Sequence, residues 1–219
     1  MNRRGFVFGF GAAVAFGWVA RARAATAIGP PWRRAPPIAV ISAPGDPRVA
    51  LVEEAAAFWN RMLAELGSGF RLGAVGVSEG SIPSGALGTL SGAALSRGPR
   101  PSMPDWLRGP AGRIVVALSD EDFISFSLRW ADAATALVGI KNGRSYPLTL
   151  PNVARNVIAH EMGHAIGLGH DSDPALLMCG RPASCRPDAF QSATARYFPL
   201  AADEKALLLS LYPPDWRAS

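Results

Sequence analysis

The sequence is short of several residue types, and each shortage narrows the possible functions. Only two of its 219 residues are cysteines, which excludes a disulfide-rich scaffold and a zinc site made of four cysteines. Only three residues are histidines, and all three lie within one short string near residue 165. No histidine therefore remains elsewhere for a Ser-His-Asp catalytic triad.

The chain also lacks the charge pattern of a nucleic-acid-binding protein. Its formal net charge is +5, but four of the 22 basic residues lie in the first 24 positions, before any acidic residue. Without residues 1–24, the basic residues outnumber the 17 acidic ones by only one. A basic stripe is therefore not expected, and nucleic acid is excluded as a partner.

No apolar run is long enough to span a membrane. The run from Phe6 to Ala20 has about fifteen residues, whereas a transmembrane helix needs about twenty. It follows a basic start, and the small-x-small pattern that ends at Ala24 is typical of a cleavage site. Residues 1–24 are thus predicted to be an export signal, similar to twin-arginine signals in its string NRRGFVFG. The alternative is an uncleaved membrane anchor.

Length and a hydrophobic content of 49% predict one domain, which we expect over residues 37–219 after an extended leader over 25–36. Strands are predicted over 37–42, 70–77, 113–118, 135–141 and 146–150, and helices over 47–66, 152–167 and 201–212. About half of segment 78–112 is Gly, Pro or Ser, which predicts a long loop. Such a loop either flanks a cleft or is a mobile insertion.

The two cysteines, Cys179 and Cys185, lie six residues apart in the string MCGRPASC. An exported protein meets an oxidising compartment, so we predict a disulfide that shapes one loop. The alternative interpretation is a pair of reduced, buried thiols.

The three histidines share the string HEMGHAIGLGHD, residues 160–171. His160 and His164 are four residues apart, so on a helix they project from the same face and can hold one ion. Gly167 lets the chain leave the helix and bring in His170 as a third ligand. Glu161 offers a carboxylate that can take a proton from water. This pattern predicts a catalytic zinc site with an open fourth position.

The spacing HExxHxxGxxH followed by a methionine resembles the signature of the metzincin zinc proteases, and the chain from residue 37 onward is similar to their matrixin type. The resemblance implies an α+β fold with a twisted, mostly parallel sheet of about five strands, three main helices and a small C-terminal subdomain. It implies one catalytic Zn²⁺ held by His160, His164 and His170, with Glu161 as general base. It also implies that Met178, in ALLMCG, forms the floor beneath the metal.

Two positions depart from the matrixin pattern. Asp171 replaces the usual serine after the third histidine, as in the adamalysin pattern, and either anchors the site or belongs to a solvated turn. Cys179 and Gly180 replace the usual Tyr-Pro type sequence after the methionine, in the segment that forms the wall of the specificity pocket in the family.

Further metal sites are not expected. No histidine remains for the second, structural zinc that matrixins often hold. The acidic string Asp120, Glu121 and Asp122 is interpreted as a solvated turn, although it also offers oxygen ligands for Ca²⁺.

Together these patterns predict an exported bacterial zinc endopeptidase, periplasmic or secreted, that acts as a monomer on a protein or peptide substrate. After removal of the signal, no stable membrane association is expected. Two alternatives remain open. One is a zinc amidase acting on cell-wall peptides, and the other is a zinc-stabilised binding module without turnover.

Overall fold

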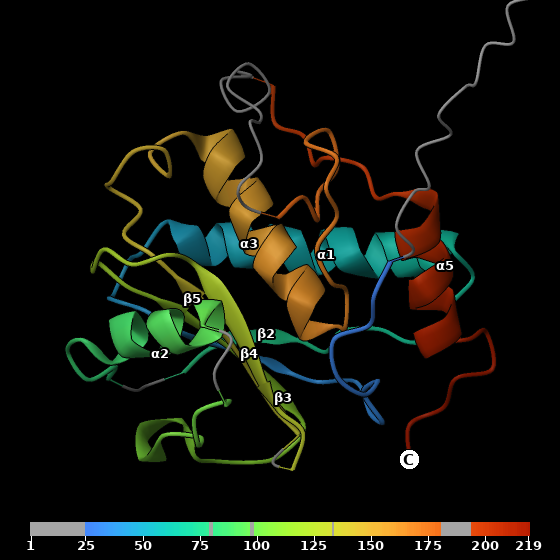
Figure 1. The fold of residues 1–219 in the computed structure, drawn as a ribbon, viewed down its shortest axis with the longest axis horizontal. Helices are drawn as coiled ribbons and strands as arrows, with labels where there is room; N and C mark the ends of the chain where they lie inside the picture. The colour runs from blue at the N-terminus through green and yellow to red at the C-terminus, as the bar shows by residue number, and fades with distance from the viewer. Residues whose placement is uncertain (1–24, 79–80, 97–98, 133, 181–193) are drawn as a thin grey trace, which may run out of the picture.

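The computed structural model describes residues 25–78, 81–96, 99–132, 134–180 and 194–219 (Figure 1). Five strands form one sheet in the order β2-β1-β3-β5-β4. β4 pairs with β5 in antiparallel orientation, and the other pairs are parallel. The α+β fold with a mostly parallel sheet is therefore confirmed. The strands are β1 Ile38–Ile41, β2 Val75–Val77, β3 Arg113–Leu118, β4 Phe126–Trp130 and β5 Thr135–Ile140.

Helices cover both faces of the sheet. α1 (Arg48–Glu65), α3 (Pro151–Ala165) and α5 (Ala202–Leu211) share one hydrophobic cluster with Ile114 and Val116 of β3. Val115 of β3 belongs to a second cluster, with residues of α2 (Ala86–Leu95) and of the short 3-10 helix Asp105–Leu107. Because successive side chains point to opposite faces, a strand covered on both sides is apolar on both, as β3 is after its first residue, Arg113.

One expected strand was misplaced. Residues 146–150 form turns, in which the Leu148 N–H donates to the Ser145 carbonyl at 2.9 Å and the Leu150 N–H to the Pro147 carbonyl at 3.0 Å. The fifth strand is instead β4, FSLRW, which alternates buried and half-buried residues. Its polar positions interrupt the apolar run, so a search for continuous hydrophobic stretches overlooks it.

The segment 78–112 is not a loop throughout, contrary to the sequence prediction. It contains α2 (Ala86–Leu95), a helix additional to the three expected, and packs Leu87 and Leu90 against the sheet. Gly88 and Gly92 lie inside α2 and lower its intrinsic helix propensity. For this reason the sequence alone did not predict the helix. Burial of its leucines compensates, because packing of an apolar face supplies most helical stability in proteins.

α3 carries the histidine string, and its first turn differs from the expected one. The helix begins at Pro151, one residue before the expected start, and Leu150 is its N-cap. Asn152 accepts a hydrogen bond from the Arg196 N–H at 3.0 Å, and buried Asn156 accepts one from the Phe198 N–H at 2.8 Å. These two amides attach the chain after residue 193 to the start of α3.

Residues 25–34 are extended and pack against the end of α3. The Ile28 N–H donates to the Gly167 carbonyl at 2.9 Å, and the Gly169 N–H donates to the Thr26 carbonyl at 2.9 Å. The Trp32 indole, 3% exposed, donates to the Ala165 carbonyl at 2.9 Å. This segment thus supports the turn between α3 and His170. None of the helices in the described ranges is both long and apolar enough to cross a membrane.

Candidate metal centre

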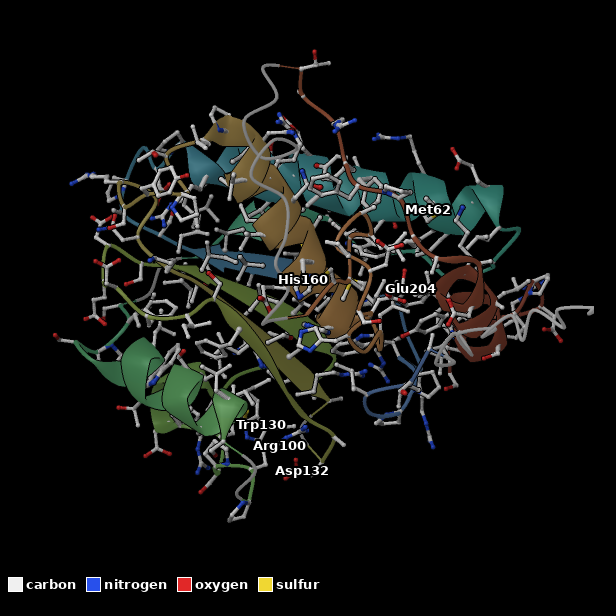
Figure 2. All side chains as sticks on the ribbon, turned by 45° about the horizontal axis from the view of Figure 1, so that its top comes forward. Met62, Arg100, Trp130, Asp132, His160 and Glu204 are labelled. Carbon is white, nitrogen blue, oxygen red and sulfur yellow. The ribbon has the colours of Figure 1, made fainter. Side chains whose placement is uncertain are left out.

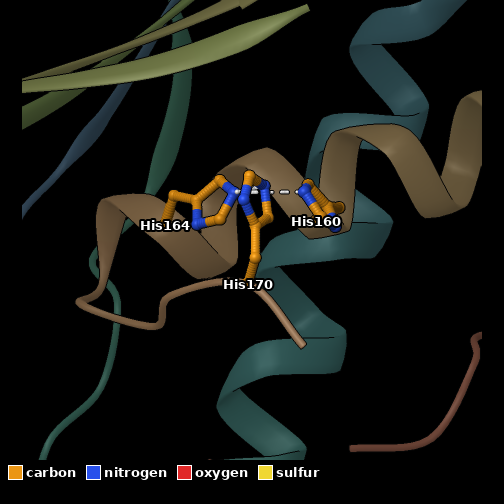
Figure 3. A group of neighbouring side chains, drawn as sticks. All are labelled: His160, His164 and His170. Carbon is orange, nitrogen blue, oxygen red and sulfur yellow. Dashed lines mark hydrogen bonds between the residues drawn. The ribbon is translucent and has the colours of Figure 1, made fainter. Parts of the chain in front are cut away.

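Three histidine side chains converge where α3 ends (Figure 3). His160 and His164 project from one face of α3, and His170 arrives from the following loop after Gly167, which has a φ of +111°. The Nε2 atom of His164 lies 3.1 Å from that of His160 and 3.0 Å from that of His170. Within the described ranges, these residues form the only group of three or more His, Cys, Asp or Glu arranged to hold a metal ion.

Two backbone carbonyls determine which nitrogen carries the proton in the helical histidines. Nδ1 of His160 lies 2.8 Å from the Leu177 oxygen, and Nδ1 of His164 lies 2.7 Å from the Leu168 oxygen. A carbonyl oxygen only accepts hydrogen bonds, so in each neutral ring Nδ1 is the donor and Nε2 carries the lone pair. The lone pairs of His160 and His164 therefore face each other, an arrangement that a cation between them stabilises.

The donor set fits a zinc ion. With a Zn–N distance of about 2.0 Å, the nitrogens of a tetrahedral site are about 3.3 Å apart, so the two separations from the His164 Nε2 atom need to widen only slightly. Burial, and to a lesser extent the nearby charge of His170, lowers the pKa of His164 to about 4. Burial also lowers the pKa of His170. Lowered pKa values favour the neutral imidazoles that metal ligation requires.

Glu161 lies beside the ligands on the same helix. Its side chain is 7% exposed. Successive residues of a helix are turned by about 100°, so Glu161 stands next to the stripe that bears His160 and His164, not on it. The metal-binding group accordingly does not include Glu161. A buried carboxylate in this place is suited to proton transfer.

Met178 packs tightly beneath the histidine helix and is fully buried. A Cβ atom added to Gly163 would lie 2.6 Å from the Met178 Sδ atom and 2.9 Å from Cζ2 of Trp59. Gly163 therefore permits the close approach of Met178 between the two helical histidines. The pattern HExxH leaves the position of Gly163 free, so the sequence alone does not mark this glycine.

The segment after Met178 holds the loop of the third histidine. The Asp171 N–H donates to the Met178 carbonyl at 2.8 Å, and the Gly180 N–H donates to the Asp171 carbonyl at 2.9 Å. A Cβ atom on Gly180 would lie 2.6 Å from Cγ of His170, so only glycine fits here. The Asp171 carboxylate accepts from the Asp173 N–H at 2.6 Å and so stabilises its own turn. In the sequence, Gly180 is visible only as a departure from the matrixin pattern.

A buried carboxyl group lies beyond this loop, at the start of α5. Glu204 is 2% exposed and accepts a hydrogen bond from the Ala201 N–H at 2.7 Å. Burial, followed by the negative charges of Asp171 and Asp203, raises the pKa of Glu204 to about 7 against the opposing effect of the Ala201 N–H. Figure 2 shows Glu204 on the α5 side of His160.

The residues of the acidic string Asp120, Glu121 and Asp122 contact other groups of the protein. Asp120 lies 3.6 Å from Arg48, and Asp122 lies 3.2 Å from Lys141. Glu121 accepts from a backbone N–H at 2.8 Å. These contacts agree with the interpretation of the string as a turn.

The predicted disulfide is only half within the described part of the chain. Cys179 is 9% exposed, whereas Cys185 lies outside the described residues. The pairing therefore stays a prediction.

No protein-family model matches the sequence, and no curated protein matches it either. Among solved structures, the chain is similar to archaemetzincin from Methanopyrus kandleri, with 19% identity, a TM-score of 0.49, and coverage of 82% of this chain and 96% of that one. It is also similar to metalloproteinase-II from Bacteroides fragilis, with 16% identity, a TM-score of 0.45, and coverage of 84% and 55%. The functional interpretation therefore depends on the residues of this chain.

Proposed function

We propose that the chain is a zinc-dependent endopeptidase of the metzincin type, similar to matrixins. The observation that carries this proposal is the convergence of three imidazoles whose facing Nε2 atoms lie 3.0 and 3.1 Å apart. In the two helical histidines these atoms carry lone pairs, because both Nδ1 atoms face carbonyl oxygens. Three neutral imidazoles leave a fourth zinc position open, which is typical of catalytic sites and not of structural ones.

A bound zinc ion supplies Lewis acidity, which lowers the pKa of water and polarises a carbonyl group. Glu161 accepts the proton of the attacking water as the water oxygen forms a bond to the carbonyl carbon. When the C–N bond breaks, Glu161 returns this proton to the departing amine nitrogen. The products are a carboxylic acid and an amine, which become a carboxylate and an ammonium group by transfer of the second water proton, and the carboxylate of Glu161 is regenerated.

The test compares the full chain with its Glu161→Gln variant, each loaded with zinc and assayed on an unfolded protein. We expect the wild type to cut internal peptide bonds and the variant to lose at least about 100-fold in rate, because proton transfer contributes about 10² to 10⁴. Zinc content, measured for both proteins, should stay equal. Equal rates at equal zinc content would exclude Glu161 as the base.

The same assay separates the alternatives. Cleavage of peptidoglycan fragments without cleavage of unfolded proteins would replace the endopeptidase proposal by a cell-wall amidase. Stoichiometric zinc without turnover on either substrate would indicate a binding module. His164→Ala should lose zinc in every case, since the central nitrogen of the group is removed.

We further propose that the protein is exported to the periplasm or medium and cleaved after Ala24. Residues 1–24 lie outside the described part of the chain, and the support comes from the residue that follows. The Ala25 N–H donates to the Asp203 carboxylate at 2.8 Å. Cleavage after Ala24 would convert this N–H into an ammonium group, which binds a carboxylate more strongly.

A further inference from the structure

A pocket of about 660 Å³ lies at the end of β4, apart from the histidine centre. Its walls come from the extended segment before β1, from the end of β4 and from the turn between β4 and β5. Figure 2 shows Trp130, one of the lining residues, at a distance from His160. No residue of α3 or of the His170 loop lines this pocket. The charged side chains that line it, those of Arg33, Arg34 and Arg129, are all basic.

Arg129 is a half-buried cation that forms no ion pair within the described ranges. Its Nη1 atom is shielded from solvent and has no hydrogen-bond partner among the described residues. Its guanidinium carbon lies 4.8 Å from the centre of the Trp32 ring. A Cβ atom added to Gly29 would lie 3.6 Å from Nη1 of Arg129. Burial lowers the pKa of Arg129, and the charge of Arg100 contributes in the same direction. A shielded charge without a partner is costly, so the negative charge of an anion in the pocket beside this guanidinium would offset an existing penalty.

The other two arginines add positive charge at the mouth of the pocket. Within the described ranges, neither Arg33 nor Arg34 forms an ion pair. The side chain of Arg34 runs over Gly112, where a Cβ atom would lie 3.2 Å from the Arg34 Cδ atom. The backbone of this wall is fixed, because the Arg33 carbonyl accepts from the Ser219 N–H at 2.8 Å. The basic groups therefore stand on a fixed frame.

We propose that this pocket binds a small organic anion, in which a phosphate or carboxylate group is joined to an apolar group. The guanidinium of Arg129 offers the planar donors that match an oxyanion. The rings of Trp32, Trp130 and Pro30 among the lining residues supply apolar surface beside it. The combination of a few charged groups with apolar walls is typical of small-molecule sites. The site is independent of the proposed peptidase activity.

The test uses the metal-free full chain, because oxyanions also coordinate zinc. Phenyl phosphate, benzoate and phenol are titrated separately by isothermal calorimetry. We expect one of the two anions to bind at one site per chain and phenol not to bind measurably. The preferred anion distinguishes a phosphate ligand from a carboxylate ligand.

Variants locate the binding. Arg129→Met should weaken binding of the preferred anion about tenfold or more. Arg34→Met, at an exposed position that does not support the core, should weaken it several-fold and so remains informative if Arg129→Met does not fold. The matched control is Arg61→Met, an exposed arginine of α1 outside the pocket, which should bind like the wild type.

The proposal is overturned if neither anion binds at millimolar concentration, or if phenol binds as well as the anions. It is also overturned if Arg34→Met and Arg61→Met weaken binding equally, because the effect would then reflect net charge alone. Since zinc is absent from every arm, these outcomes leave the peptidase proposal untouched.

Discussion

Two glycines determine how closely the backbone approaches the histidine centre. Gly163 faces Met178 and Trp59, and Gly180 faces the ring of His170. Any side chain at these positions would overlap a neighbour, at contact distances of 2.6 Å for a Cβ alone. The geometry of the ligands thus depends on residues that cannot bind a metal themselves.

Substitution Gly180→Ala tests this dependence. The new Cβ would meet Cγ of His170 at 2.6 Å, so the ring must move and lose its alignment with His164. We expect zinc affinity to fall about tenfold or more, by analogy with the loss of groups that orient ligands. Competition with a chelator of known affinity measures the change.

The control for Gly180→Ala is Gly88→Ala in α2. No atom lies within 4 Å of a Cβ at Gly88, and alanine stabilises a helix interior by about 0.5–1 kcal/mol relative to glycine. This variant should keep the zinc affinity of the wild type. Unchanged affinity in Gly180→Ala would show that His170 does not need its present position.

At the scale of elements, the end of α3 is completed by side chains from both ends of the chain. The last carbonyls of a helix have no partner within it. Here the Trp32 indole donates to the Ala165 carbonyl at 2.9 Å, and the Tyr212 hydroxyl donates to the Ile166 carbonyl at 2.8 Å. The same hydroxyl accepts from the Trp32 N–H at 3.3 Å. The leader and the segment after α5 thereby fix the helix that carries His160 and His164.

Removing this hydroxyl should destabilise the protein. Tyr212→Phe leaves the Ile166 carbonyl and the Trp32 N–H buried without this partner, and such groups cost about 1–3 kcal/mol. We expect the free energy of unfolding in urea to fall by that amount. The control Tyr146→Phe removes a hydroxyl from a residue that is 72% exposed and should have no measurable effect. Equal stability of the two variants would contradict the capping role of Tyr212.

Elements with a strong local pattern were predictable, and those stabilised by distant contacts were not. β3 and β5 are continuous apolar runs, and the string from His160 to His170 specifies its own spacing. β4 contains Arg129 within its five residues, and α2 contains glycines, so their stability comes from packing on the sheet. The roles of Gly163 and Gly180 depend on side chains far away in the sequence, which no local pattern shows.

At the scale of the whole molecule, both ends of the described chain contact each other. The Trp216 indole donates to the Trp32 carbonyl at 3.1 Å, and the Ser219 N–H donates to the Arg33 carbonyl at 2.8 Å. Further along, the Ala25 N–H reaches the Asp203 carboxylate at the start of α5. Contacts between residues 25–33 and residues 203–219 join the segments that pack against α3. A change at residue 25 should therefore affect the stability of the helix that carries two of the metal ligands.

The contact of Ala25 with Asp203 predicts that cleavage after Ala24 changes the free energy of unfolding. In a chain that begins at Ala25, an ammonium group replaces the N–H that binds Asp203. This contact is partly buried, and it involves the residue next to Glu204, whose pKa is raised. We expect the free energy of unfolding to rise by about 1 kcal/mol relative to a chain with one extra residue, Ala24. In a domain of this size that corresponds to about 2–4 °C in Tm, measured at low salt.

Asp203→Asn supplies the control for this comparison, because it keeps an acceptor for the N–H but removes the negative charge. In that background the chains starting at Ala24 and Ala25 should melt at the same temperature. High salt should also reduce the difference between the wild-type chains, since a partly exposed ion pair is screened. If the chain starting at Ala25 is not the more stable one, the new terminus does not pair with Asp203. Its hydrogen bond then supports the leader alone and gives no support for cleavage at Ala24.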